Sequence, residues 1–232
     1  MQGMLAYQSE MGTMKLKPSQ GRSRRWLLAA LATAAVTLGA PAMSAAKDPL
    51  ILVLGDSLSA EYGLARGQGW VALLQQRLEK NLPQVRVVNA SVSGDTSAGG
   101  RARLPGLLAR HQPTVVVIEL GANDALRGLP LQSTQANLQA MVQASQAAGA
   151  KVLLLGMQVP PNYGSAYGRD FAAVFSVVAR QNKTALLPFL LAGIADAPDP
   201  LAWFQSDRIH PTAKAHPRML DNVWPHLQPL LR

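Results

Sequence analysis

An apolar run, LILVL at residues 50–54, leads directly into GDS at residues 55–57 and is the strongest indication of the fold. Five consecutive apolar residues are typical of a strand that is buried on both faces, as in a parallel sheet. The glycine and the two polar residues indicate that the strand ends there. Ser57 is therefore expected at the carboxyl end of an interior strand, which is where open α/β sheets bind ligands.

Four more short apolar runs follow, and helix-like segments separate them. The predicted strands are residues 50–54, 85–89, 114–120, 152–156 and 185–189, and the predicted helices are residues 69–81, 97–111, 133–148, 167–182 and 211–231. The last helix is expected to be interrupted at Pro217 and Pro225. Because right-handed crossovers place helices on both faces of a parallel sheet, we expect an α/β fold: a three-layer α/β/α sandwich around a five-stranded, doubly wound parallel sheet.

The first 46 residues have the layout of a secretory signal peptide. A basic cluster at residues 22–25 precedes an apolar run at 26–38 and a stretch of small residues at 40–46. The apolar run is shorter than the ~20 residues that a membrane-spanning helix needs, which favours a cleaved leader over a stable membrane anchor. We expect residues 1–46 to be removed and residues 47–232 to form one periplasmic or secreted domain. An amphipathic or buried first helix is the alternative, and translation from Met14 stays open.

The composition argues against several classes of function. Cysteine is absent, which excludes disulfides, thiolate metal sites and a cysteine nucleophile. The formal net charge is +9, but the leader contributes five basic residues and one acidic residue, and the other basic residues are scattered. That distribution is not typical of a nucleic-acid-binding surface. Neither a nucleotide-binding loop motif nor a metal-ligand spacing occurs, so no cofactor and no metal are expected.

Four polar segments follow predicted strands or open the last predicted helix. They are GDSLS at residues 55–59, NASVSGDT at 89–96, GAND at 121–124 and DRIHP at 207–211. Since the carboxyl ends of parallel strands meet at one edge of a sheet, these segments can converge on a single site.

The residue types in these segments fit acyl transfer. Serine needs a base to become a good nucleophile, and histidine titrates near neutral pH, so Ser57 and His210 suit the roles of nucleophile and base. Asp207, three residues before the histidine, can hold the imidazole in the required orientation. The Ser57 N–H, the Gly94 N–H and the Asn123 carboxamide are candidate oxyanion donors. Taken singly, each of these residues is equally typical of a turn or a helix cap.

The four segments together resemble the signature blocks of the SGNH (GDSL) hydrolase superfamily, in the order that the superfamily has them. Longer stretches, such as LGDSLSAEYGL and VIELGANDALRG, are similar to bacterial periplasmic arylesterases and multifunctional acyl-CoA thioesterases and lysophospholipases. The resemblance covers nearly all of residues 49–232. It implies a flavodoxin-like SGNH hydrolase fold, a triad of Ser57, His210 and Asp207, and an oxyanion hole made by Ser57, Gly94 and Asn123. Many relatives have glycine where this chain has Ala122 and Arg208, but neither difference removes a catalytic group.

The resemblance also implies a substrate class. The substrate would be a small acyl ester or thioester, such as an aryl or fatty acyl ester, an acyl-CoA or a lysophospholipid, and the protein would be a monomer or a weak oligomer. Pro160 and Tyr163, which follow the fourth predicted strand, would line an apolar acyl groove, although this segment also fits an ordinary crossover loop. A carbohydrate O-deacetylase and a non-catalytic periplasmic binding module are the alternatives.

Two further expectations concern residues outside these roles. Asp124 is expected to cap a loop or a helix. The other histidines, His111, His216 and His226, are expected at the surface or at helix caps.

Overall fold

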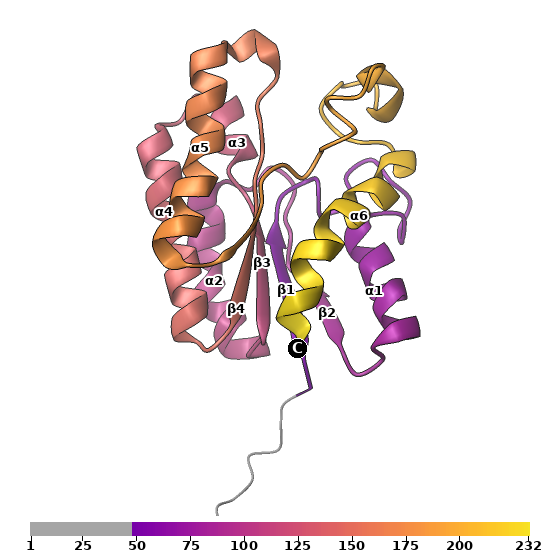
Figure 1. The fold of residues 1–232 in the computed structure, drawn as a ribbon, viewed down its shortest axis with the longest axis vertical. Helices are drawn as coiled ribbons and strands as arrows, with labels where there is room; N and C mark the ends of the chain where they lie inside the picture. Colours follow the sequence, from indigo (N-terminus) through magenta and orange to yellow (C-terminus); the bar gives the residue numbers. More distant parts are fainter. Residues whose placement is uncertain (1–47) are drawn as a thin grey trace, which may run out of the picture. The chain divides into compact units, whose positions relative to one another are not determined.

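The computed structural model describes residues 48–232, so the predicted signal peptide lies outside the described residues. A single parallel sheet runs through this part of the chain, in the strand order β2-β1-β3-β4-β5 (Figure 1). Its strands are β1 (Leu50–Gly55), β2 (Arg86–Asn89), β3 (Val115–Glu119), β4 (Lys151–Leu155) and β5 (Ala185–Leu187).

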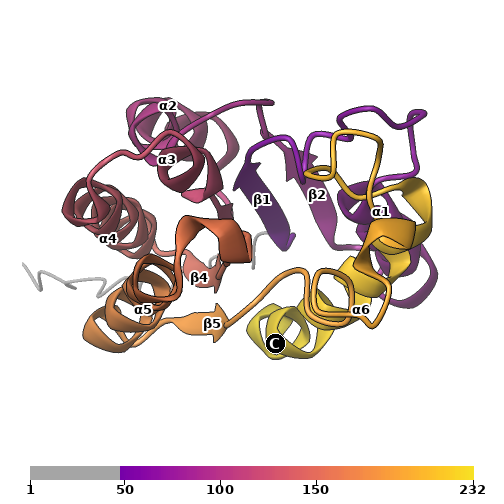
Figure 2. The same cartoon turned by 90° about the horizontal axis from the view of Figure 1, so that it is seen from above.

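Helices cover both faces of the sheet (Figure 2). The helices are α1 (Trp70–Asn81), α2 (Ser97–His111), α3 (Ala122–Leu126), α4 (Leu131–Ala147), α5 (Ser165–Asn182) and α6 (His216–Leu227). One layer contains α2, α4 and α5, which pack side by side, and the other contains α1 and α6. The prediction of a doubly wound α/β/α sandwich is therefore confirmed.

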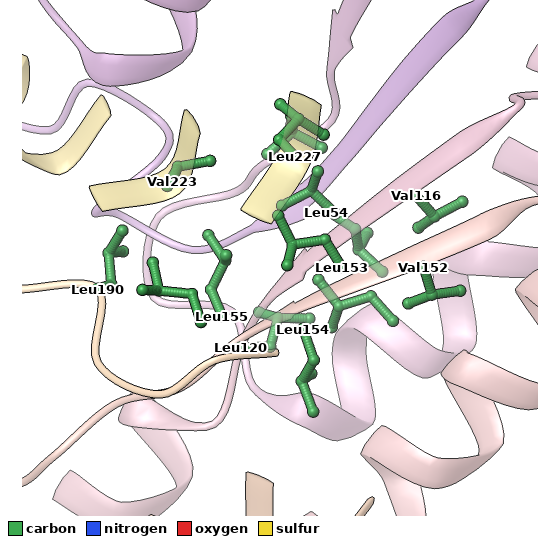
Figure 3. Packing of buried hydrophobic residues seen from close by; sticks show 14 of the residues in the cluster. Leu54, Val116, Leu120, Val152, Leu153, Leu154, Leu155, Leu190, Val223 and Leu227 are labelled. Atoms are coloured by element: carbon green, nitrogen blue, oxygen red, sulfur yellow. The ribbon is translucent and has the colours of Figure 1, made fainter. Parts of the chain in front are cut away.

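The core lies between the sheet and these two helix layers. All the residues of β1 and β3 are buried, as expected for interior strands with helices on both faces. Figure 3 shows Leu54, Val116 and Leu153 of the strands among the buried side chains that include Val223 and Leu227 of α6. Each buried leucine or valine of this kind contributes ~1.5–3 kcal/mol relative to an exposed side chain.

The structure differs from the predicted elements in two places. The short helix α3, which carries Asn123, falls in a segment that the sequence predicted to be a loop. The closing helix begins at His216 rather than at residue 211, because Pro211 pairs with Phe204 in an antiparallel bridge. Neither predicted interruption ends the helix: Pro217 occupies its first turn, where no intrahelical bond is lost, and Pro225 lies inside it near the end.

The topology also defines where a ligand site can form. From β1 the chain crosses through α1 to β2 at one edge, and β3 lies on the other side of β1. In open sheets of this order, the crevice opens beyond the carboxyl ends of β1 and β3. Within residues 48–232, no helix is both long and apolar enough to cross a bilayer.

Candidate active site

Ser57 lies in a tight turn directly after β1. Asp56 organises that turn, because its backbone oxygen accepts the N–H groups of Ser59 at 3.2 Å and Ala60 at 3.0 Å. Its carboxylate Oδ1 also accepts the Leu58 N–H at 3.0 Å. The Ser57 side chain therefore projects from a fixed backbone at the carboxyl edge of the sheet.

His210 and Asp207 lie in the loop before α6 and complete a chain of hydrogen bonds to the serine. The His210 Nε2 atom is 2.9 Å from Ser57 Oγ, and the His210 Nδ1 atom is 2.7 Å from Asp207 Oδ2. The other carboxylate oxygen of Asp207 accepts the backbone N–H groups of Ile209 and His210, at 2.9 and 3.0 Å. One carboxylate thus shapes the loop and orients the imidazole at the same time.

The environment of Asp207 keeps its carboxylate ionised. Partial burial alone would raise its pKa, but the hydrogen bonds from the His210 N–H, the His210 ring and the Ile209 N–H outweigh that effect and lower the pKa to about 2. An ionised carboxylate on Nδ1 favours a proton at that nitrogen, which leaves Nε2 free to accept a proton from the serine.

Tyr62 packs against the imidazole and was not singled out from the sequence. Its ring centroid lies 4.2 Å from that of His210, and half of the tyrosine remains exposed. The Gln205 side-chain amide joins the two loops, since it donates to the backbone oxygens of Tyr62 at 2.9 Å and of Pro211 at 3.0 Å. The sequence gives no periodic signal for such a contact, which joins residues about 150 positions apart.

The three candidate oxyanion donors differ in how they are engaged. Within residues 48–232, the backbone N–H groups of Ser57 and Gly94 donate no hydrogen bond. The Asn123 Nδ2 atom donates to Asp56 Oδ2 at 3.0 Å and to the Asp95 backbone oxygen at 2.9 Å. Two of the three candidate donors are therefore free, and the third already has two acceptors.

The backbone conformation at Gly94 favours glycine. Its φ is +77°, which other residues rarely adopt. A Cβ at this position would have one described side-chain atom near it, an Arg127 guanidinium nitrogen at 3.6 Å.

Pro160 and Tyr163 lie in the exposed segment between β4 and α5, where Pro160 immediately precedes the 3-10 helix Pro161–Tyr163. The Tyr163 hydroxyl donates to the Leu126 backbone oxygen at 3.5 Å, and the neighbouring Tyr167 hydroxyl donates to the Ala125 oxygen at 3.3 Å. These contacts join the segment to α3, the helix that carries Asn123. Within residues 48–232, no hydrogen bond or ring contact joins Pro160 or Tyr163 to Ser57 or His210.

Asp124 and His216 are both buried, and both cap helices other than their own. The Asp124 carboxylate accepts the N–H of Ser97, the first residue of α2, at 2.8 Å. The His216 Nδ1 atom accepts the N–H of Trp70, the first residue of α1, at 3.0 Å. The expectation of a helix cap is confirmed for both residues, and of the two alternatives expected for His216, surface or cap, the structure shows a buried cap.

The described residues provide no evident place for a metal ion. Residues 48–232 contain no cluster of three or more histidine, aspartate or glutamate side chains arranged to hold one.

Comparison with known proteins identifies relatives over most of the chain. The esterase TesA of Pseudomonas aeruginosa is 57% identical over 181 residues, which make up 78% of this chain and 89% of that protein. The thioesterase 1/protease 1/lysophospholipase L1 of Escherichia coli K12 is 42% identical over 207 residues, or 89% of this chain and 94% of that protein.

A solved structure shows the same architecture. The psychrotrophic esterase EstA from Pseudoalteromonas sp., in a crystal structure inhibited by monoethylphosphonate, aligns with a TM-score of 0.74 at 41% sequence identity. The alignment covers 79% of this chain and 99% of that one.

The family of the chain follows from these matches. The model of the GDSL-like lipase/acylhydrolase family matches residues 53–218, a span that includes all four polar segments. Relatives at this level of identity are enzymes, and so is this chain. The chain belongs to the GDSL-like lipase/acylhydrolase family, as its four sequence blocks predicted.

Proposed function

We propose that the chain hydrolyses carboxylic acyl esters and thioesters through an acyl-enzyme on Ser57. The Ser57 Oγ atom attacks the carbonyl carbon while His210 Nε2 accepts the hydroxyl proton. The C–O or C–S bond of the resulting tetrahedral intermediate then breaks, and the histidine returns the proton to the leaving alcohol or thiol. Water, deprotonated by the same nitrogen, attacks the acyl-enzyme and releases the carboxylic acid and the serine.

Negative charge builds up on the former carbonyl oxygen in each half-reaction. The free N–H groups of Ser57 and Gly94 and the Asn123 carboxamide would bind this oxygen. Donors that are held in place before the reaction stabilise the transition state more than the neutral carbonyl, which is the basis of their effect on rate.

One observation carries the proposal: the unbroken order of hydroxyl, imidazole and carboxylate, with contacts of 2.9 and 2.7 Å. A histidine and an aspartate at a surface loop need not meet a serine 153 positions away, yet these three do. The esterase and thioesterase names of the relatives support the same reaction and both classes of leaving group.

The surroundings of the triad favour an acyl substrate over a carbohydrate. Tyr62 and Ile209 are exposed apolar side chains that lie against or beside His210, and exposed Tyr163 lies against α3. Exposed apolar groups gathered at a site are typical of surfaces that bind apolar ligands. Aryl and fatty acyl esters, acyl-CoA and lysophospholipids fit this chemistry, with Pro160 and Tyr163 as candidate contacts for the acyl chain.

The experiment combines a covalent probe with turnover. A fluorophosphonate should label the protein once, at Ser57, and the protein should hydrolyse p-nitrophenyl esters and an acyl-CoA. Ser57→Ala should abolish both labelling and turnover, while Ser133→Ala, at an exposed position of α4, serves as a matched control that keeps both. Full turnover by folded Ser57→Ala protein would contradict the mechanism.

We also propose that the enzyme is exported after removal of residues 1–46, on the evidence of the basic, apolar and small-residue order of that segment. Mass spectrometry of protein from a periplasmic fraction should show a mature chain that starts near Lys47. An intact apolar segment in a cytoplasmic product would argue against export.

A further inference from the structure

Two buried carboxyl groups lie next to Ser57, and the reaction scheme uses neither. Asp56 follows β1 and Glu119 ends β3, where Glu119 pairs in register with Gly55. Their exposed fractions are 1% and 0%. Acidic side chains are almost never this deeply buried without a specific partner, so the pair calls for a physical explanation.

Glu119 supports the backbone that carries the nucleophile. Its Oε2 atom accepts the Asp56 N–H at 3.2 Å and the Ser59 hydroxyl at 2.8 Å, on either side of Ser57. A Cβ at Gly55 would lie 2.8 Å from the same Oε2 atom, so the glycine leaves the space that the carboxyl group occupies. The turn and the buried acid therefore fit each other closely.

Asp56 links this support to the oxyanion hole. One oxygen of its carboxylate accepts the Leu58 N–H at 3.0 Å, directly after the nucleophile. The other accepts the Asn123 Nδ2 hydrogen at 3.0 Å. A continuous path of contacts thus runs from Glu119 through Asp56 to the Asn123 carboxamide.

The pair is expected to hold one proton between its two carboxyl groups. Burial, together with the charge of Asp56, raises the pKa of Glu119 well above its usual value. Burial raises the pKa of Asp56 to about 6, while its hydrogen bonds and the nearby His210 oppose the increase. Two adjacent buried carboxylates do not both ionise readily, so burial and the charge of Asp56 favour the proton on Glu119 rather than on Asp56.

The geometry indicates which atom of Glu119 bears the proton. Its Oε2 atom already accepts two hydrogen bonds, whereas its Oε1 atom is buried and has no hydrogen-bond partner among residues 48–232. A proton on Oε1 would turn an unsatisfied acceptor into a donor, and a side-chain hydrogen bond between Glu119 and Asp56 contributes to the shifted pKa of each group.

We propose that Glu119 is a positioning residue for the hydrolysis: as a neutral acid it fixes Asp56, and Asp56 in turn orients the Asn123 carboxamide and the Ser57 turn. This inference rests on the proposed function only in its effect on turnover. A neutral Glu119 also avoids a second negative charge beside the developing oxyanion, which an ionised Glu119 would repel.

Substitutions at Glu119 test the proposal through kcat. Glu119→Gln preserves the shape and hydrogen-bonding capacity of a neutral acid and should keep kcat within about threefold of the wild-type value near neutral pH. Glu119→Ala should lower kcat at least about thirtyfold with little change in KM. If Glu119→Ala does not fold, Glu119→Met takes its place in the same measurement. Leu78→Ala, a buried truncation in the last turns of α1, is the control that should leave kcat unchanged.

Nuclear magnetic resonance gives a second readout that does not need activity. The Glu119 carboxyl carbon should have the chemical shift of a neutral acid near neutral pH. The side-chain NH₂ signals of Asn123 should move in Glu119→Ala or Glu119→Met, but not in Glu119→Gln.

These measurements separate the two proposals. Absence of ester turnover in the wild-type protein contradicts the proposed function alone, because the resonance measurements still test the pair. The inference would be overturned if folded Glu119→Ala or Glu119→Met kept the wild-type kcat. It would also be overturned if Glu119→Gln lost as much kcat as Glu119→Ala, or if the carbon chemical shift showed an ionised Glu119.

Discussion

The carboxamide of Asn123 already has two hydrogen-bond acceptors in the free enzyme, Asp56 Oδ2 and the Asp95 backbone oxygen. In the proposed oxyanion hole, the oxyanion would have to share or replace one of them. The remaining bond would hold the direction of the amide, so the carboxamide would not have to be ordered during the reaction.

Asn123→Ala should therefore affect turnover much more than binding. We expect kcat to fall by about 10²–10³, or ~2.7–4 kcal/mol of transition-state stabilisation, with a much smaller change in KM. Steady-state kinetics on a short p-nitrophenyl ester measures both constants. Asn222→Ala is a matched control, because the Asn222 amide likewise donates two hydrogen bonds, to the backbone oxygens of Leu190 and Ala192. A similar loss in both variants would point to a structural effect.

Tyr62 is predicted to hold the imidazole by ring packing rather than by its hydroxyl. Aromatic contacts of this kind are worth about 0.5–1.5 kcal/mol, so Tyr62→Ala should lower kcat/KM by about two- to tenfold. Tyr62→Phe keeps the ring at 4.2 Å from His210 and should behave like the wild type. If the phenylalanine variant lost as much as the alanine variant, the hydroxyl would be the important group.

Helix α3, which carries Asn123, is joined to helices α2 and α4 through the Asp124 carboxylate. Besides the Ser97 N–H, its carboxylate accepts the hydroxyl groups of Ser97 at 2.5 Å and of Thr134 at 3.3 Å. It therefore ties the start of α2 to α3 and α4. All three donors point at a group that can only accept, which explains why an aspartate fits this buried position.

Asp124→Ala should consequently reduce stability. Removing a buried charged acceptor leaves its donors unpaired and lowers the free energy of unfolding by about 1.5–3 kcal/mol. Urea denaturation compares the variant with the wild type, and the exposed Asp170→Ala on α5 is the control. Unchanged stability in Asp124→Ala would mean that water replaces the carboxylate at no loss.

The elements that the sequence predicted are those with a strong local pattern. Apolar runs identified all five strands, and helical spacing identified α1, α2, α4 and α5, with boundaries close to the observed ones. Helix α3 has only five residues, too few for a periodic pattern to be visible. The segment before α6 depends on the bridge between Phe204 and Pro211, which requires the tertiary fold.

In the candidate site too, residues in a local sequence pattern could be predicted, whereas residues defined by contacts between distant parts of the chain could not. Ser57, Gly94, Asn123 and His210 were identifiable because each lies in a polar segment after a strand or before the last helix. Glu119 was not, since one acidic residue at the end of an apolar strand does not reveal its partner 63 positions away. Contacts that cross the sheet become visible only when the strand order is known.

His216 joins helix α6 to helix α1, and its protonation affects the stability of the whole domain. Its exposed fraction is 2%, and it accepts the first N–H of α1, one of the donors that a helix cannot satisfy internally. Burial lowers the pKa of His216 to about 4, below the 6.5 of an unperturbed histidine. The neutral ring is therefore part of the folded structure.

The sign of the resulting pH dependence follows from proton counts. Between pH 4 and 6.5 the unfolded chain binds a proton at His216 that the native state does not, so the free energy of unfolding rises with pH in this window and falls on acidification. Asp56 acts in the opposite direction, because its pKa is raised from 3.8 to about 6. The stability that it contributes at low pH is lost as the pH rises through that interval. Glu119, whose pKa is also raised, acts in the same direction as Asp56, so both carboxyl groups oppose the effect of His216 in the wild-type protein.

His216→Gln should remove one side of this balance, since glutamine retains an acceptor for the Trp70 N–H but does not titrate. The free energy of unfolding of the wild type, minus that of the variant, should then increase by on the order of 3 kcal/mol from pH 4 to pH 6.5. This value is the free-energy equivalent of the difference between the usual pKa of 6.5 and the pKa of about 4 in the folded protein. Urea denaturation at several pH values measures the difference, with His226→Gln as the histidine control. A constant difference across this range would show that His216 titrates alike in the folded and unfolded states, and the α1–α6 contact would then hold equally well with a charged ring.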